Sequence, residues 1–123
     1  MTEDYKISFV SDRLTDQIIE GRKTASCEWL DRQGEQNEWN DALVVGRYYT
    51  VCDSYYAGRC RIRITSIRLC RWDDIPKWLW RGETNENADE FRADHIEYFN
   101  NPSDDFEFVG YEFELVEELG EAE

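Results

Sequence analysis

Four cysteines and one histidine are the side chains of this chain that could bind a transition metal. Cys27, Cys52, Cys60 and Cys70 form no C-x-x-C pair, and His95 is the single histidine. Because structural zinc sites use closely spaced pairs of such ligands, we expect neither a metal site nor a cofactor. We interpret the cysteines as buried thiols in a reducing compartment, with a disulfide framework or a reactive thiol as the alternatives.

Three arginines alternate with apolar residues in the middle of the chain. Arg59, Arg61 and Arg63 fall on one face of a predicted strand, about 6.6 Å apart, while Cys60 and Ile62 face the other way. The planar guanidinium group fits phosphate oxygens, so this row could bind a phosphate-bearing ligand. The alternative is a solvated face whose arginines pair with carboxylates, each pair contributing less than about 1 kcal/mol.

Aromatic residues make up 15% of the chain and include five tryptophans. Trp29, Trp78 and Trp80 could stack on a nucleobase, although packing in or beside the hydrophobic core is the more common role of such residues. His95 lies near Phe91 in a predicted helix. We interpret it as a packed histidine with one hydrogen bond rather than as a catalytic base.

The net charge of −14 is unevenly distributed along the chain. Residues 1–46 hold 5 Lys and Arg against 10 Asp and Glu, residues 47–81 hold 8 against 3, and residues 82–123 hold 1 against 15. Such a distribution disfavours binding to duplex DNA, which normally uses a basic face. It leaves room for a local pocket that takes a phosphate or a polar ligand.

The length of 123 residues, 41% of them hydrophobic, predicts a single compact domain over residues 1–123. No apolar run approaches the 18 residues that a transmembrane helix needs, so we expect no membrane partner. The first residues lack the basic and then apolar pattern of a secretory signal. We therefore expect a cytoplasmic protein.

The hydrophobic pattern predicts more strands than helices. A strand is expected over 5–10 and a helix over 12–20, with Ser11 as its N-cap and Gly21 as the left-handed residue after it. An extended segment over 22–27 and a polar loop over 31–41 follow. Strands over 44–51 and 59–69, joined by a turn over 53–58, predict a hairpin.

The second half of the chain predicts helices and a last strand. A short helical turn is expected over 72–80, and Asn87 and Glu90 fit the capping box of a helix that stops before Pro102. A final strand over 106–116 changes its apolar phase, which a bulge near Gly110 would explain. We predict an α+β fold, a curved sheet or barrel with two or three helices packed on it.

Several motifs together resemble the ASCH family, whose members adopt a PUA-like β-barrel. The resemblance covers residues 10–118, and it begins with Gly21-Arg22-Lys23-Thr24-Ala25-Ser26, which is similar to the family signature G-[KR]-K-T-x-[TS]. The further matching pieces, in order, are Gly46, the turn Asp53 to Gly58, Thr65-Ser66-Ile67, Trp72-Asp73-Asp74-Ile75, Gly82-Glu83, Arg92-x-x-His95-x-x-Tyr98-Phe99 and Gly110 to Val116.

The resemblance implies a set of catalytic residues. Small ASCH enzymes that deacylate N4-acylated cytidine use a lysine, a hydroxyl residue and a glutamate, and these fall on Lys23, Ser26 and Glu83. Two departures occur: Phe91 stands where the family has tryptophan, and Arg81 precedes the glycine where many relatives have glutamate. The glutamate of the family is therefore matched to Glu83, which requires one residue of slack in the alignment.

These residue types suit the hydrolysis of an amide. A lysine that is partly removed from water can act as a base, and a hydroxyl can attack an acyl carbonyl or position a water molecule. In a straight extended segment, however, Thr24 and Ser26 face away from Lys23, so both hydroxyls remain candidates. The structural alternative for Lys23 is an exposed lysine near a helix C-terminus, worth about 0.3–1 kcal/mol.

We therefore expect a protein that binds a small nucleoside, a nucleotide or a single-stranded RNA base. The leading hypothesis is an amidohydrolase acting on N4-acetylcytidine-type nucleosides. A non-catalytic RNA-binding module linked to translation, or a ribonuclease, is the alternative. The candidate catalytic residues are Lys23, Thr24, Ser26 and Glu83, and the candidate ligand-binding residues are Trp29, Asp53, Arg59, Arg61, Arg63 and Trp80.

Overall fold

The computed structural model describes residues 5–9, 11–30 and 43–119. The predicted loop over 31–41 lies outside the described residues. One five-stranded mixed sheet has the order β1-β3-β4-β5-β2, in which β1 and β3 are parallel and the other neighbours antiparallel. The strands are β1 (Tyr5–Ser8), β2 (Ala25–Trp29), β3 (Tyr48–Cys52), β4 (Gly58–Arg71) and β5 (Glu107–Glu118), and the helices are α1 (Asp12–Ile19), α2 (Lys77–Gly82) and α3 (Ala88–His95).

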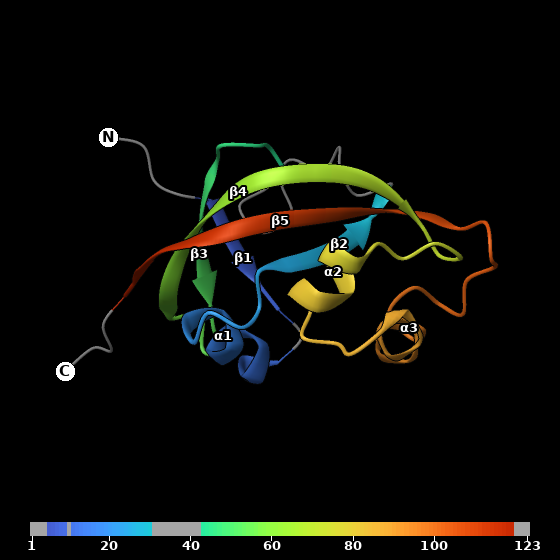
Figure 1. The fold of residues 1–123 in the computed structure, drawn as a ribbon. Helices are drawn as coiled ribbons and strands as arrows, with labels where there is room; N and C mark the ends of the chain where they lie inside the picture. Colours follow the sequence, from blue (N-terminus) through green and yellow to red (C-terminus); the bar gives the residue numbers. More distant parts are fainter. Residues whose placement is uncertain (1–4, 10, 31–42, 120–123) are drawn as a thin grey trace.

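The sheet curls into a half-barrel with three helices packed on it, which confirms the predicted α+β class. Figure 1 shows the long strands β4 and β5 curving over α2 and α3, with α1 at the other end of the sheet. No helix of the described ranges is long and apolar enough to cross a membrane.

The hairpin of β3 and β4 is confirmed, but its first strand begins later than predicted. Val44 and Val45 are exposed and lie in a turn that Gly46 closes with a φ of +89°, so β3 starts only at Tyr48. The alternation predicted for β4 is confirmed, because Cys60, Ile62 and Ile64 are buried while the arginines between them are not.

The predicted bulge near Gly110 is wrong. The pairing of β5 with β2 and β4 runs without interruption past Gly110, and the register shifts of β4 and β5 lie between Arg61 and Ile62 and again beyond Ile64. The apolar phase changes because the two ends of β5 bury opposite faces. Phe108 belongs to one core cluster and Tyr111 to another, and a separation of three residues places them on opposite sides of a strand.

The two clusters divide the core between the helices. The first lies against α2 and α3 and contains Ala25, Cys27, Cys70, Trp72, Ile75, Leu79, Phe91, Phe99 and Phe108. The second lies towards α1 and β1 and contains Ile18, Tyr49, Val51, Cys60, Ile62, Ile64, Tyr111 and Phe113. All four cysteines are free and buried, as the thiol interpretation expected. Burial raises the pKa of Cys60 and of Cys70 to about 11.

The helix ends largely follow the predicted capping pattern. Ser11 is the N-cap residue of α1, although its hydroxyl makes no capping hydrogen bond, and Gly21 has the left-handed φ of +83°. At α3 the Asn87 side chain accepts a hydrogen bond from the Glu90 amide at 2.8 Å. The Glu90 carboxylate turns to the Glu86 amide instead of closing the box on Asn87.

Candidate functional site

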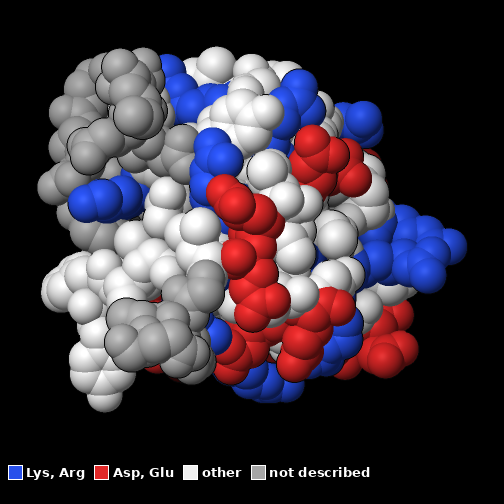
Figure 2. Space-filling model, turned by 90° about the vertical axis from the view of Figure 1, so that its left-hand side faces the viewer, with Lys and Arg blue, Asp and Glu red and all other residues white. Residues whose placement is uncertain are grey.

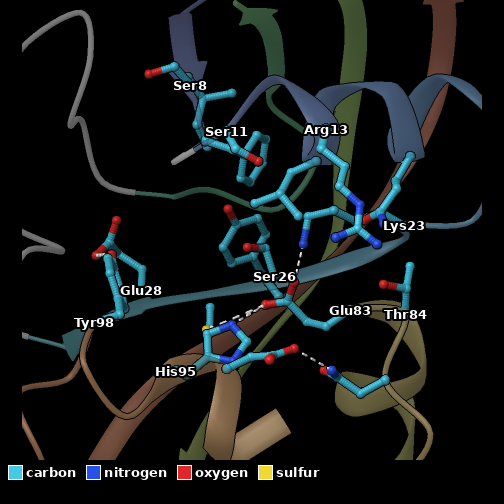
Figure 3. Close-up of a pocket in the computed structure, with 18 of the residues that line it drawn as sticks. Ser8, Ser11, Arg13, Lys23, Ser26, Glu28, Glu83, Thr84, His95 and Tyr98 are labelled. Carbon is cyan, nitrogen blue, oxygen red and sulfur yellow. Dashed lines mark hydrogen bonds and ion pairs between the residues drawn. The ribbon is translucent and has the colours of Figure 1, made fainter. Parts of the chain in front are cut away.

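A cavity of about 640 Å³ lies between the two edges of the curled sheet. Residues of β1 and β2, the first and last strands in the sheet order, line it together with residues of α1, α3 and the segment after α2. The half-barrel is therefore open where these strands fail to pair with each other. Lys23, Ser26 and Glu83 all line this cavity (Figure 3).

The end of α1 directs Lys23 into the cavity. The Lys23 amide donates a hydrogen bond to the Gln17 carbonyl at 3.1 Å, and the Thr24 amide donates to the Gly82 carbonyl at 2.9 Å, so the chain turns sharply before β2 begins. Lys23 is 2% exposed, and its Nζ donates to the Ala25 carbonyl at 2.8 Å. The alternative of an exposed lysine is therefore wrong.

Lys23 forms a buried ion pair with Glu83, sixty residues further along the chain. Figure 3 shows the lysine reaching towards the Glu83 carboxylate, with His95 on the other side of that carboxylate. The Nζ atom also lies 5.3 Å from the centre of the Phe9 ring. Burial of both charges makes the pair sensitive to the loss of either partner, because an unpaired charge in the interior is costly.

Gly82 brings Glu83 close to Lys23. Glu83 is the C-cap residue of α2, and the helix packs so closely on β2 that a Cβ atom at Gly82 would lie 2.4 Å from the Cβ of Ala25. Real Cβ atoms do not approach so closely. The glycine is therefore required for the contact between α2 and β2 that brings the two charges together.

Replacing Gly82 by alanine is expected to lower the free energy of unfolding by about 1–3 kcal/mol, because the added methyl group forces α2 away from β2. Urea denaturation measures the effect. The double variant Ala25→Gly, Gly82→Ala removes the opposing methyl group and should recover part of the loss. Equal stability of Gly82→Ala and the wild type would show that the helix and strand separate without cost.

Three groups surround the Glu83 carboxylate. Besides Lys23, the His95 Nε2 lies 3.1 Å and the Cys27 Sγ 3.6 Å from Glu83 Oε2. Burial alone would raise the pKa of Glu83, but the charges and hydrogen bonds of Lys23 and His95 outweigh it and lower the pKa to about 2. Glu83 is thus ionised at neutral pH although it is 7% exposed.

The surroundings of His95 favour its cationic form. Its Nδ1 lies 2.8 Å from the Phe91 carbonyl, and its Nε2 faces the ionised Glu83; both partners are acceptors, and only the cation can donate to both. Burial lowers the pKa of His95, but the hydrogen bond and charge of Glu83 outweigh it and raise the pKa above its ordinary value. The prediction of a packed histidine is confirmed, since its ring stacks on Phe91, but the ring has two hydrogen-bond partners instead of the one that was predicted.

The raised pKa of His95 predicts a pH-dependent contribution to stability. The contribution is present below the unfolded-state pKa of about 6.5 and is lost as pH rises through the higher folded-state pKa. The variant His95→Gln keeps a donor for Glu83 but cannot titrate. We expect the difference in unfolding free energy between wild type and variant to be larger at pH 6 than at pH 9 in urea denaturation. A difference that does not change with pH would contradict the cationic state.

Cys27, Glu83 and His95 could also be considered as metal ligands. Their donor atoms all lie within 4.8 Å of one another, a proximity that the sequence spacing did not indicate because it arises from the fold. Lys23 already occupies the Glu83 carboxylate, and its positive charge opposes a second cation there. Burial and the neighbouring Glu83 raise the pKa of the Cys27 thiol well above its ordinary value, which disfavours the thiolate that metals bind.

The structure separates the two candidate hydroxyl residues. Ser26 is buried, lines the cavity and lies opposite Tyr111 in the pairing of β2 with β5. The Tyr111 hydroxyl interacts with the Ser26 hydroxyl. Burial raises the pKa of Tyr111 well above its ordinary value, although the contact with Ser26 opposes the shift. Thr24 is exposed and lies outside the cavity lining. Lys23 and Ser26 share the cavity because the bend of the chain comes before β2.

The wall of the cavity holds further polar residues that the sequence analysis did not select. The Tyr98 hydroxyl donates a hydrogen bond to Glu28 at 2.6 Å, and both residues line the cavity, as does the exposed Arg13 (Figure 3). Gln17 and Asn85 are buried and line it as well. Of these residues only Tyr98 lies in a motif of the family resemblance.

The arginine row lies away from the cavity and is paired with carboxylates. Arg59 pairs with Asp16 at 3.3 Å, and the other two arginines pair with Glu117 at 3.2 Å and Glu114 at 3.4 Å. On the face of the molecule that Figure 2 shows, acidic and basic side chains lie next to each other and form no continuous basic surface. The geometry therefore favours the salt-bridged face over a phosphate site at Arg59, Arg61 and Arg63.

The remaining ligand-binding candidates have structural contacts. The Asp53 carboxylate accepts hydrogen bonds from the amides of Tyr55 and Ala57, which shapes the turn between β3 and β4. Trp29 packs edge-on against Phe99, and Trp80 packs on the first core cluster. None of Asp53, Trp29 and Trp80 lines the cavity among the described residues.

A sequence model of the ASCH domain matches residues 5–117. The chain belongs to the ASCH domain family. No curated protein matches the chain. Among solved structures, an ASCH domain from Lactobacillus crispatus JV V101 has 20% identity and a TM-score of 0.74 over 90% of this chain and 79% of its own.

Two further structures show the same fold. Protein EF3133 from Enterococcus faecalis V583 has 20% identity and a TM-score of 0.68 over 100% of this chain and 87% of its own. The ASCH protein from Zymomonas mobilis has 10% identity and a TM-score of 0.57 over 93% and 71%. At these identities the likeness supports the ASCH fold, and the function of this ASCH domain has to be inferred from its own cavity.

Proposed function

We propose that this ASCH domain binds a small N-acylated nucleoside of the N4-acetylcytidine type in its cavity and hydrolyses the acyl amide. The observation that carries the proposal is the buried ion pair of Lys23 and Glu83, which lines a cavity of about 640 Å³ together with Ser26. Cavities of about 300–1,000 Å³ are typical of small-molecule sites. A neutral ligand of this kind is also indifferent to the net charge of −14.

In the proposed reaction, the Ser26 hydroxyl or a water molecule that it positions adds to the acyl carbonyl carbon. Lys23 first passes its own proton to Glu83 across the ion pair, and the neutral amine then accepts the proton of the nucleophile and gives it to the departing nitrogen, so that the C–N bond breaks and the free amine leaves. Glu83 returns its proton to Lys23 and restores the ion pair. An acyl group on Ser26 would then be released by water as the carboxylic acid. Glu83 holds Lys23 in place, and the cationic His95 supports the negative charge on the carbonyl oxygen electrostatically.

The test is an assay of N4-acetylcytidine, with cytidine and acetate measured by chromatography. The wild type is expected to release both products. Ser26→Ala is expected to slow the release by about 10²-fold or more, whereas Thr24→Val, which changes the exposed hydroxyl two residues earlier, should not. Failure of the folded wild type to release cytidine would overturn the proposed hydrolysis.

Binding of single-stranded RNA through the arginine row is the alternative that a salt titration tests. Because Arg59, Arg61 and Arg63 are paired with carboxylates, we expect weak binding whose affinity barely changes with salt. Each phosphate that the row neutralised would instead add about −0.7 to the slope of log affinity against log salt. A steep slope that Arg→Gln substitutions at these positions flatten would favour the RNA-binding function.

A further inference from the structure

A second polar group lies in the cavity, apart from the ion pair of Lys23 and Glu83. Glu28 lines the cavity from β2, two residues after Ser26. Residues two apart face the same side of a strand, with their Cα atoms about 6.6 Å from each other. Figure 3 shows Glu28 together with Tyr98 at the end of the cavity away from Lys23. A ligand that reaches from Ser26 along β2 therefore meets the Glu28 carboxylate.

One oxygen of this carboxylate is held by two hydrogen bonds. Glu28 Oε1 accepts from the Tyr98 hydroxyl at 2.6 Å and from the Trp29 main-chain amide at 2.8 Å. The Tyr98 ring packs edge-on against Phe99, a buried residue of the first core cluster, with 4.9 Å between the ring centres. Because the donors come from β2 and from the segment after α3, the fold itself fixes the carboxylate before a ligand binds.

The other oxygen of the carboxylate, Oε2, is left for a ligand. Within the described residues, Oε2 makes no hydrogen bond and no ion pair. Glu28 is half-buried, and Oε2 is not one of the fully enclosed oxygens that lack a partner, which are Thr15 Oγ1, Gln17 Oε1 and Asn85 Oδ1. It can therefore be reached from the cavity. An ionised carboxylate only accepts hydrogen bonds, so the ligand group that fits this oxygen is an O–H or N–H donor.

The place of Glu28 relative to Ser26 favours a sugar hydroxyl as this donor. In the proposed function the acyl amide lies at Ser26, and in an N4-acylated cytidine the sugar is attached at the opposite end of the pyrimidine ring. The donors at that end are the hydroxyl groups on the sugar ring. Dinucleotide-binding proteins recognise ribose hydroxyls with a carboxylate in the same way.

We propose that Glu28, positioned by Tyr98, is a specificity-determining residue that accepts a hydrogen bond from the 2′- or 3′-hydroxyl of the sugar. The inference rests on the nucleoside binding of the proposed function, and it selects among nucleosides. Ribonucleosides supply a donor to Oε2, whereas 2′,3′-dideoxynucleosides and free bases leave it unpaired. A site that is built to pair with a hydroxyl discriminates against the analogue that lacks it.

The experiment compares two ligands that differ only in these hydroxyls. The affinities of cytidine and 2′,3′-dideoxycytidine are measured by NMR titration of the ¹⁵N-labelled protein. The wild type is expected to bind cytidine about tenfold more tightly, because a hydrogen bond to a charged acceptor contributes about that factor. Equal affinities for the two ligands, or no binding of cytidine, would overturn the inference.

The variant Glu28→Gln tests the acceptor without removing its support. The Tyr98 hydroxyl and the Trp29 amide still require an acceptor, so the glutamine turns its oxygen to them and its NH₂ group to the ligand. The preference for cytidine should therefore be lost, and Tyr98→Phe, which frees the carboxylate, should reduce it. Glu86→Gln, which changes an exposed carboxylate outside the cavity lining, should keep the full preference.

Thermal denaturation separates ligand recognition from a structural role. Because glutamine keeps both hydrogen bonds of Oε1, Glu28→Gln is expected to unfold at nearly the same temperature as the wild type while its preference for cytidine disappears. A variant that loses stability but keeps the preference would overturn the inference, since the carboxylate would then serve the fold alone.

The same measurements distinguish this inference from the proposed function. If the wild type prefers cytidine but does not deacylate N4-acetylcytidine, the proposed hydrolysis fails and the inference stands. If it deacylates N4-acetylcytidine and the 2′,3′-dideoxy derivative with equal kcat/KM and binds the two probes equally, the proposed function stands and the inference fails.

Discussion

Replacing Lys23 by methionine is expected to abolish deacylation of N4-acetylcytidine and to lower the free energy of unfolding by about 3–5 kcal/mol. The stability effect is large because the substitution leaves the Glu83 carboxylate buried with one of its two cations removed. Methionine keeps most of the length of the side chain, so a lost packing volume contributes little. Urea denaturation and the chromatographic assay measure the two effects on the same preparation.

The double variant Lys23→Met, Glu83→Gln provides the control for the buried charge. With the carboxylate neutralised, most of the lost stability should return, while activity should remain absent because Lys23 is still missing. A single variant as stable as the wild type would show that Glu83 does not depend on Lys23 in the folded state.

Replacing Glu83 by glutamine is expected to remove most of the acid sensitivity of the fold. The pKa of Glu83 is lowered from 4.5 to about 2, so its contribution to stability is complete above the unfolded-state pKa and is lost as pH falls through the folded-state pKa. The shift corresponds to about 3 kcal/mol between pH 6 and pH 2. Unfolding free energies at a series of pH values should therefore fall more steeply for the wild type than for Glu83→Gln.

Glu86→Gln is the matched control for this series. Glu86 is exposed and lies outside the cavity lining, three residues after Glu83 on the same segment. Its substitution removes one negative charge from nearly the same place but no buried ion pair. The unfolding free energy of Glu86→Gln should follow the wild-type pH dependence. If Glu83→Gln and Glu86→Gln gave parallel curves, the ion pair of Lys23 and Glu83 would not control the stability in acid.

The sequence was sufficient to predict the fold class and most of the elements, because these depend on local patterns. The alternation of arginines and apolar residues predicted β4, and Asn87 predicted the start of α3. The errors arose where long-range packing decides. The phase change at Gly110 looks like a local bulge in the sequence, but it records that the two ends of β5 bury opposite faces.

The candidate site was only partly predictable. The family resemblance brought Lys23, Ser26 and Glu83 to attention, and the structure places all three at one cavity. In a straight strand Lys23 and Ser26 would face opposite sides, so a shared site for the two side chains looked unfavourable. The bend before β2 that brings them to one cavity has no turn residue to mark it in the sequence. Neither Gln17 nor Asn85 stood out, because the burial of an amide side chain and the lack of a partner for its oxygen depend on the fold.

The sheet order has a consequence for when the cavity can form during synthesis. In the sheet β2 pairs only with β5, whose residues are nearly the last of the described chain to leave the ribosome, although β2 is made early. Until residues 107–118 emerge, the strand that contains Ser26 has no partner strand. Thr24, next to Lys23, also lacks the hydrogen bond that its carbonyl accepts from the Phe113 amide. A nascent chain arrested before β5 would therefore leave β2 unpaired and the cavity incomplete, and pairing over such sequence distances makes folding slow.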